Sequence, residues 1–343
     1  MYYFATLFDR NYLSRGIVLY ESLKKNCREF VLYVLCLDEL TLDFFIKNSN
    51  KYPNIKTLSL SELEESDNEL KECRKSRSLI EYYFTLSPCL PLYILKKYNS
   101  VHVCTLDADI MFFSSPAPIF ELLENCSILI TPHDFSPDFK SHEIYGLHNV
   151  SFQIFKNNTE GLNCLERWKK QCIDWCYDKL EDGKFADQKY LDDWVHFYDK
   201  VRPISILGSG VAPWNIKLYK ITNRNKSTFV NDRKLIFYHF HGLRILRKNI
   251  VYHKLNVYEV IPERNLVRHI YRPYIKKLLS NKLSDDSNIN RNNINTKSLL
   301  KTLAFEENWF YYKAGILFKP NIFFRVLGRI MIRIKNLKVK CLS

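Results

Sequence analysis

Two aspartates one residue apart, Asp107 and Asp109, interrupt an otherwise apolar segment, residues 101–113. Side chains two apart in an extended chain point to the same face, so these carboxylates would stand side by side at the end of a buried strand. Like charges this close raise each other's pKa or need a cation between them. A solvated turn is the alternative, but the apolar residues on both sides disfavour an exposed tip. Two hard oxygen ligands suit Mg²⁺ or Mn²⁺, which also bind substrate phosphates, so the sequence predicts a divalent-cation site that holds a diphosphate.

A pair of histidines, His239 and His241, lies in the segment FYHFHGL. Alternating histidines on a strand are commonly core and surface neighbours rather than metal ligands. An imidazole is nevertheless a suitable third ligand for Mn²⁺. The pair alone leaves both interpretations open.

A sheet must position these groups, and strand-like and helix-like segments alternate in the first third of the chain. The strand-like segments are 2–8, 29–38, 54–60 and 101–106, and the helix-like ones are 16–26, 39–52, 61–77 and 78–98. This alternation predicts βαβ units in a parallel sheet, which binds ligands at the carboxyl ends of its strands. The second half is more mixed, with strand-like segments at 127–135, 149–158, 202–210 and 233–243 and helices at 161–182 and after 188.

The segment LDADIMFF, about a hundred residues after FATLFDRNYLSRGIVLYESLKKN, resembles the GT-A-fold glycosyltransferases, most closely the glycogenin-like family 8 type. The resemblance implies an α/β fold with a Rossmann-like, mixed but mainly parallel sheet flanked by helices, here with a helical C-terminal extension. It also implies that Asp107 and Asp109 bind Mn²⁺ or Mg²⁺ with His239 as third ligand. The family's Lys-Pro-Trp after the histidine segment is replaced by Leu243, Arg244 and Ile245, so the phosphate-binding cation would be Arg244 or Arg247.

The same resemblance assigns the remaining site residues. The backbone of Thr6 and Leu7 and the side chains of Asp9, Asn11 and Tyr12 would hold the base and ribose, although Asp9 is equally suited to cap a helix. Arg77, with Arg74 as the alternative, would approach the donor sugar and diphosphate. Asn149 and Ser151 would line the sugar pocket. Asp187 and Gln188 would lie beside the anomeric carbon as catalytic residues; the alternative for Asp187 is a helix cap.

These residues predict a metal-dependent glycosyltransferase that moves a sugar from a nucleoside-diphosphate donor, expected to be a UDP-sugar, to a glycan or lipid-linked glycan. We expect retention of the anomeric configuration. The alternatives are a non-catalytic relative that binds sugar nucleotides and a haloacid-dehalogenase-like phosphohydrolase. The second is disfavoured because its DxD lies near the N-terminus of the chain, whereas the pair here begins at Asp107.

The composition is globular, with 46% hydrophobic and 26% charged residues, and the formal net charge of +14 favours anionic partners. We expect no nucleic-acid partner, because no zinc-finger, RNP-type or helix-turn-helix pattern is present. No signal segment or membrane-spanning apolar run is found, and the ten cysteines include no CxxC pair. These features predict reduced thiols and a cytoplasmic location.

Three regions are expected along the chain. Residues 1–282 would form the glycosyltransferase domain, and residues 283–298 are polar and low in complexity, which indicates a linker. Residues 299–343 form a basic extension whose FFRVLGRIMIRIKNLKVK segment interleaves cations with apolar side chains. It would contact the inner face of an anionic membrane peripherally; a terminal helix packed on the domain is the alternative.

Overall fold

The structure is a computed structural model that describes residues 1–247, 250–281, 309–313 and 316–318. It divides into two compact units. Unit 1 comprises Met1–Lys220 and Phe229–His239, and unit 2 comprises Ile221–Thr228 and Phe240–Ser343. The predicted linker, 283–298, lies outside the described residues, as does most of the predicted extension, 299–343.

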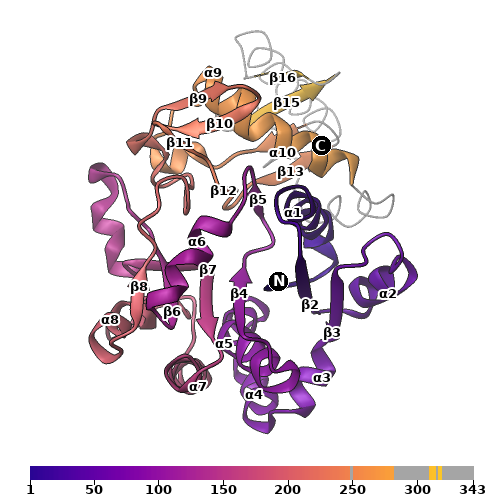
Figure 1. Ribbon diagram of the computed structural model, residues 1–343, viewed down its shortest axis with the longest axis vertical. Helices are drawn as coiled ribbons and strands as arrows, with labels where there is room; N and C mark the ends of the chain where they lie inside the picture. Colours follow the sequence, from indigo (N-terminus) through magenta and orange to yellow (C-terminus); the bar gives the residue numbers. More distant parts are fainter. Residues whose placement is uncertain (248–249, 282–308, 314–315, 319–343) are drawn as a thin grey trace, which may run out of the picture. The chain divides into compact units, whose positions relative to one another are not determined.

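A seven-stranded sheet with the strand order β3-β2-β1-β4-β7-β6-β8 forms the centre of unit 1 (Figure 1). Its strands are β1 (Tyr2–Phe8), β2 (Phe30–Cys36), β3 (Ile55–Ser59), β4 (His102–Leu106), β6 (Ile128–Pro132), β7 (His148–Lys156) and β8 (Val201–Pro203). Only β7 runs antiparallel to its neighbours β4 and β6, and the other pairs are parallel. The predicted mixed, mainly parallel sheet is therefore confirmed.

Helices cover both faces of this sheet, because both faces of its strands are apolar. They are α1 (Leu13–Asn26), α2 (Glu39–Lys47), α3 (Leu60–Glu65), α4 (Asn68–Cys73), α5 (Leu79–Tyr98), α6 (Ala117–Glu121), α7 (Thr159–Asp174) and α8 (Trp194–Phe197). On one face, α5 and α7 pack side by side over a core that includes Val103 and Phe155. On the other, Phe4 packs against Phe112 and Phe120.

Short 3₁₀ turns and strands complete unit 1. The turns are η1 (Arg10–Tyr12), η2 (Arg74–Ser76), η3 (Leu122–Asn125), η4 (Pro137–Tyr145), η5 (Lys189–Asp193) and η6 (Ile216–Leu218). Strand β5 (Ile110–Phe112) pairs with β12 (Phe237–His239), and β10 (Ser227–Val230) pairs with β11 (Arg233–Lys234).

Unit 2 contains a strand β9 (Ile221–Arg224) and a four-stranded antiparallel sheet of β13 (Arg244–Arg247), β14 (Ile250–Tyr252), β15 (Trp309–Lys313) and β16 (Ile316–Phe318). Its helical segments are η7 (Leu255–Tyr258), α9 (Arg264–Leu266), the π-helical turn η8 (Val267–Tyr271) and α10 (Arg272–Ser280). A helical C-terminal segment is thus present, but it precedes the predicted linker. The described part of the extension consists of the strands β15 and β16.

Several sequence-based boundaries need correction. The helix predicted for 161–182 ends at Asp174, and the strand predicted for 233–243 is divided into two short strands, β11 (Arg233–Lys234) and β12 (Phe237–His239). The single helix predicted for residues 61–77 is divided into α3, α4 and η2, because the Asp67 side chain accepts a hydrogen bond from the Leu70 amide at 3.2 Å and starts a new helix. The strand predicted for 202–210 ends at Pro203. A loop follows in which Gly208 and Gly210 adopt positive φ angles, +96° and +64°, that end an extended strand.

The described cysteines pack in the interior and form no disulfide, and eight of these nine are buried. Burial raises the pKa of the Cys36 thiol to about 12, which keeps it protonated and unreactive at neutral pH. Within the described part of the chain, no helix has the combination of length and apolarity needed to cross a bilayer.

Candidate active site

The turn between β4 and β5 carries the two aspartates. The backbone N–H of Asp107 donates to the carbonyl of Ser151 at 2.9 Å, and the N–H of Ile110 donates back to the carbonyl of Asp107 at 3.2 Å. Strand β5 then pairs with β12 in a register that sets Ile110 opposite His239. Because Asp109 precedes Ile110, this register brings the histidine next to the carboxylates although 130 residues separate them in the sequence.

The ligand atoms of Asp107, Asp109 and His239 all lie within 4.8 Å of one another. His239 Nε2 is 3.0 Å from a carboxylate oxygen of Asp109 and 3.5 Å from one of Asp107. Asp109 and His239 are buried, whereas 42% of the Asp107 side chain is exposed. The cluster therefore opens to solvent on the Asp107 side, where a phosphate could reach a bound ion.

The charges of this cluster call for a cation. Burial raises the pKa of Asp107 to about 6, His239 opposes this rise, and the nearby charge of Asp109 adds to it. Two carboxylates and one imidazole, with one side open for water and phosphate, fit the coordination habits of Mn²⁺ or Mg²⁺. The donor set fits the predicted metal.

The loop at 208–215 supports the histidine. The carbonyl of Val211 accepts the backbone N–H of His239 at 2.9 Å, and the Trp214 ring meets the imidazole edge-to-face with centroids 5.4 Å apart. Trp214 Nε1 in turn donates to the carbonyl of His133 at 2.8 Å. These contacts fix the ring that would face the metal.

Gly208 anchors this loop to the segment before β12, and we predict that Gly208→Ala lowers the free energy of unfolding by about 3 kcal/mol. Its φ is +96°, and an added Cβ would lie 2.3 Å from the Lys234 carbonyl oxygen. The matched control is Gly183→Ala, where φ is +71° but no atom lies within 4 Å of the Cβ. That control carries only the backbone strain, about 1 kcal/mol. Urea denaturation measures the free energy of unfolding of each variant. Equal decreases in the two variants would contradict a steric role of Gly208.

The N-terminal loop after β1 contains the predicted nucleotide contacts. Thr6 is buried in β1, and Leu7 is partly buried beside it. Asp9 accepts hydrogen bonds from the backbone and side chain of Asn11, each at 3.0 Å, and caps η1. Asp9 therefore caps a helical turn, which was the alternative to nucleotide binding. Its contact with a nucleotide stays a prediction.

Tyr12 lies within electrostatic range of the two aspartates. Removal of water raises the pKa of its hydroxyl, the charges of Asp109 and Asp107 raise it further, and Arg15 opposes them. The guanidinium of Arg15 lies over the Tyr12 ring, 4.2 Å from its centroid. With 40% of its side chain exposed, Tyr12 offers the side of its ring that Arg15 does not cover.

Asn149 and Ser151 form a buried bracket under the aspartate turn. Asn149 Oδ1 accepts from the backbone N–H and the hydroxyl of Ser151, at 3.1 and 2.5 Å, while its amide donates to the Pro132 carbonyl at 3.2 Å. The Ser151 carbonyl holds Asp107, as described above. These contacts reveal a positioning role that the sequence did not indicate; the predicted contact of both side chains with a sugar stays a prediction.

Asp187 is a buried carboxyl with a strongly raised pKa. It is 2% exposed, and burial raises its pKa to about 7, with a further contribution from the Asp107 charge and opposition from Ser87. Within the described residues, its Oδ2 has no hydrogen-bond partner. The N-cap of the following turn, η5, is Gln188, so Asp187 is not the helix cap that was its alternative. Gln188 itself donates to the Tyr145 carbonyl at 3.0 Å.

No protein-family model matches this chain. It is 28% identical to the uncharacterized protein YfnD of Bacillus subtilis (strain 168) over 281 residues, which are 81% of this chain and 88% of YfnD. It is 30% identical to the uncharacterized protein YfnF of the same organism over 255 residues, 72% of this chain and 83% of YfnF. The chain belongs to the YfnF family.

The solved structures identify the fold of this YfnF relative. Its structure is similar to that of the galactosyltransferase LgtC in complex with donor and acceptor sugar analogs, with a TM-score of 0.51 and 12% sequence identity. The similarity covers 81% of this chain and 95% of LgtC. The predicted GT-A fold is confirmed by this likeness.

The predicted arginines of the YfnF relative contact protein groups. Arg77 donates to the Tyr177 hydroxyl at 2.5 Å and the Ile173 carbonyl at 2.9 Å, and Arg74, its alternative, pairs with Glu64 at 2.8 Å. Arg244 belongs to unit 2, where its guanidinium lies over the Tyr252 ring. The roles assigned to Arg77 and Arg244 stay predictions.

Sequence reasoning also missed residues close to the site. The supporting contacts of His133 and Trp214 were not foreseen. The signal available was the polar pair His133–Asp134 directly after a buried strand, at the sheet edge where ligands bind.

Proposed function

We propose that this protein is a metal-dependent glycosyltransferase that transfers a sugar from a nucleoside-diphosphate donor to a glycan or lipid-linked glycan acceptor, with UDP-sugar as the donor class. The observation that carries the proposal is the convergence of Asp107, Asp109 and His239 at the carboxyl edge of the sheet. The GT-A fold supports the same conclusion.

Asp107, Asp109 and His239 would hold Mn²⁺ or Mg²⁺. When bound, the ion supplies Lewis-acid neutralisation of the charge that develops on the leaving diphosphate. The partly exposed Asp107 is the ligand nearest to solvent and so to the donor. Tyr12 beside the pair would stack on the base, and Asn149 and Ser151 keep the aspartate turn in place.

The transfer needs a group that stabilises positive charge at the anomeric carbon. As the acceptor oxygen bonds to that carbon, its bond to the diphosphate oxygen breaks and the electron pair leaves with the diphosphate. The acceptor proton passes to the departing phosphate oxygen, on the face from which attack occurs, so the configuration is retained. Asp187, when ionised, and Gln188 would stabilise and position this centre.

For the parts of the chain outside the described residues, the proposed roles rest on the sequence. Residues 1–282 would carry the catalytic machinery, and 299–343 would contact an anionic membrane surface through their basic and apolar side chains. A cytoplasmic, membrane-peripheral enzyme would meet lipid-linked acceptors there.

Metal-dependent release of nucleotide tests the proposed function. We expect purified protein with Mn²⁺ or Mg²⁺ to release UDP from one member of a panel of UDP-sugars, and EDTA to lower that rate about a hundredfold or more. Restoration by added Mn²⁺ is the control. Release of phosphate from sugar phosphates, with all UDP-sugars intact, would instead identify a phosphohydrolase, and binding without turnover would identify a non-catalytic relative.

A further inference from the structure

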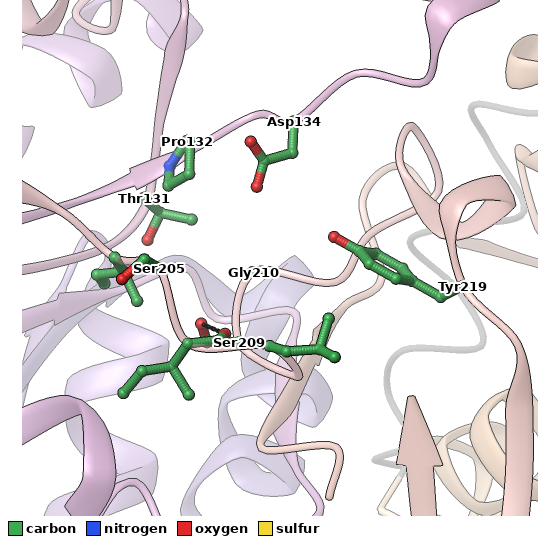
Figure 2. Close-up of a pocket in the computed structure, with 10 residues that line it drawn as sticks. Thr131, Pro132, Asp134, Ser205, Ser209, Gly210 and Tyr219 are labelled. Carbon is green, nitrogen blue, oxygen red and sulfur yellow. Dashed lines mark hydrogen bonds between the residues drawn. The ribbon is translucent and has the colours of Figure 1, made fainter. Parts of the chain in front are cut away.

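A second pocket opens at the sheet edge that carries the metal ligands. Its cavity volume is about 120 Å³, between the end of β6, the loop after β8 and Tyr219. Figure 2 shows the Asp134 carboxylate and the Tyr219 hydroxyl directed into the space between them.

The strand directions place this pocket near the candidate metal site. β4 and β6 both run antiparallel to β7, so their carboxyl ends lie at the same edge of the sheet, two strands apart. Strand spacing makes that separation about 10 Å. Asp107 follows β4; Pro132 is the last residue of β6, and Asp134 comes two residues after it.

The two sites also share a scaffold. Gly210 lines the pocket, and its neighbour Val211 accepts the backbone N–H of the metal ligand His239. The carbonyl of His133, between Pro132 and Asp134, accepts from Trp214, which packs on the His239 ring. A molecule bound in the pocket would therefore rest on the structure that positions the metal ligand.

The polar groups of the pocket recognise hydroxyls. In the described part of the chain, neither the Asp134 carboxylate nor the Tyr219 hydroxyl is hydrogen-bonded to a protein group. Two other hydroxyls, those of Thr131 and Ser209, donate to the backbone carbonyls of Phe152 and Ile206. They retain acceptor capacity. The pocket thus offers several acceptors and the Tyr219 donor.

Charge decides which class of molecule fits. No Lys, Arg or His is among the residues that line the pocket, and Asp134 gives it a negative charge. A phosphate or carboxylate would meet this charge with no cationic side chain in the pocket lining to offset it, although His148 lies within electrostatic range of Asp134. The apolar walls, which include Pro132, Ile204 and Leu207, suit the carbon-bearing face of a sugar ring. Although the whole chain is strongly basic, this pocket disfavours anions.

The backbone at Asp134 is held in an uncommon conformation. Its φ is +48°, in the left-handed region that L-residues other than Asn, Asp and Gly rarely occupy. The burial of Tyr219 and the charge of Asp134 together raise the pKa of the Tyr219 hydroxyl, which keeps it a donor at neutral pH.

We propose that the pocket between Asp134 and Tyr219 is the acceptor subsite, and that it takes an uncharged sugar ring whose hydroxyls donate to Asp134. This inference rests on the proposed function and names its second substrate by class. The donor, an anionic nucleotide sugar, binds at the metal; the acceptor, a neutral sugar, binds two strands away. One acceptor hydroxyl would face the donor while others are held by Asp134 and Tyr219.

The test is UDP release from UDP-glucose and UDP-galactose with Mn²⁺, in the presence of methyl glucosides, methyl galactosides or glucuronic acid. For the wild-type protein we expect a neutral glycoside to raise the rate about tenfold or more, with the sugar added to that glycoside, and glucuronic acid to leave it unchanged. Absence of any donor turnover would remove the proposed function. Donor turnover that no neutral sugar accelerates, or that glucuronic acid accelerates equally, would overturn this inference alone.

Two variants then locate the subsite. Asp134→Asn keeps the size and tolerates the left-handed backbone but removes the charged acceptor, so the KM for the neutral glycoside should rise about tenfold or more. Tyr219→Phe should raise that KM about fivefold. The matched control is Asp43→Asn in α2, where an exposed carboxylate pairs with the exposed Lys47. If both site variants have the KM of the control, the pocket does not bind the acceptor.

Discussion

Asp109→Asn is expected to lower metal-dependent UDP release about a thousandfold or more. Asp109 is buried, and its carboxylate oxygen lies 3.0 Å from His239 Nε2. The amide has nearly the same shape but brings no negative charge and only a weak metal ligand. The remaining carboxylate, Asp107, is more exposed and would bind Mn²⁺ poorly without its partner.

The cause of this loss can be separated from misfolding. The variant removes one of two adjacent like charges, so the free energy of unfolding without metal should stay equal to that of the wild type or rise. Calorimetry should show Mn²⁺ binding in the presence of UDP for the wild type and for Asp43→Asn, and none for Asp109→Asn. Undiminished Mn²⁺ affinity in Asp109→Asn would show that the cluster is not a metal site.

The sequence predicted those parts of the site that depend on local spacing. Asp107 and Asp109 are adjacent on one strand end, so their residue types and the period of two were enough to group them. The sheet could also be predicted, because the alternation of strand-like and helix-like segments is a local pattern in the sequence. His239 needed more, because its place beside Asp109 depends on the register between β5 and β12. Only the family resemblance supplied that link before the structure was known.

Long-range contacts explain what the sequence could not predict. Arg77 had the residue type expected of a phosphate contact, but a tyrosine 100 residues further along the chain holds its guanidinium. The acceptor pocket joins Asp134 to Tyr219 across 85 residues, through a loop expected to be a strand. The pattern of apolar and polar residues does not predict that Asp134 and Tyr219 lie close together, because their proximity depends on how the loops after β6 and β8 pack.

Asp187→Asn should abolish most activity and yet stabilise the protein. The carboxyl is buried, and its folded pKa of about 7 exceeds the usual value of 3.8. Between these values the folded state binds more protons than the unfolded state, so Asp187 makes the free energy of unfolding fall as pH rises from about 4 to 7. Above pH 7 the ionised carboxyl lowers the free energy of unfolding by about 4 kcal/mol, because its pKa rises from 3.8 to about 7 on folding. The uncharged amide avoids that cost.

The measurement is the free energy of unfolding in urea with EDTA present, at pH 5, 7 and 9. The gain of Asp187→Asn over the wild type should increase from pH 5 to pH 7 and level off at about 2–4 kcal/mol, while UDP release falls about a hundredfold. Asp192→Asn is the control of opposite sign. Burial alone would raise the pKa of Asp192, but hydrogen bonds from His148 and Lys189 lower it. Its stabilising contribution is therefore present at neutral pH and lost in acid, so Asp192→Asn should destabilise the protein at pH 7.

The contrast between these two buried carboxylates separates a functional group from a structural one. Asp192 is satisfied by its neighbours, whereas Asp187 keeps an oxygen without a protein partner and costs stability at neutral pH. Such a cost can persist in a protein when the group acts on something that the folded chain alone does not provide, which is what the proposed role of Asp187 at the sugar donor requires. If Asp187→Asn instead destabilises the protein at pH 9, Asp187 has a structural partner and is not the charge that stabilises the anomeric centre.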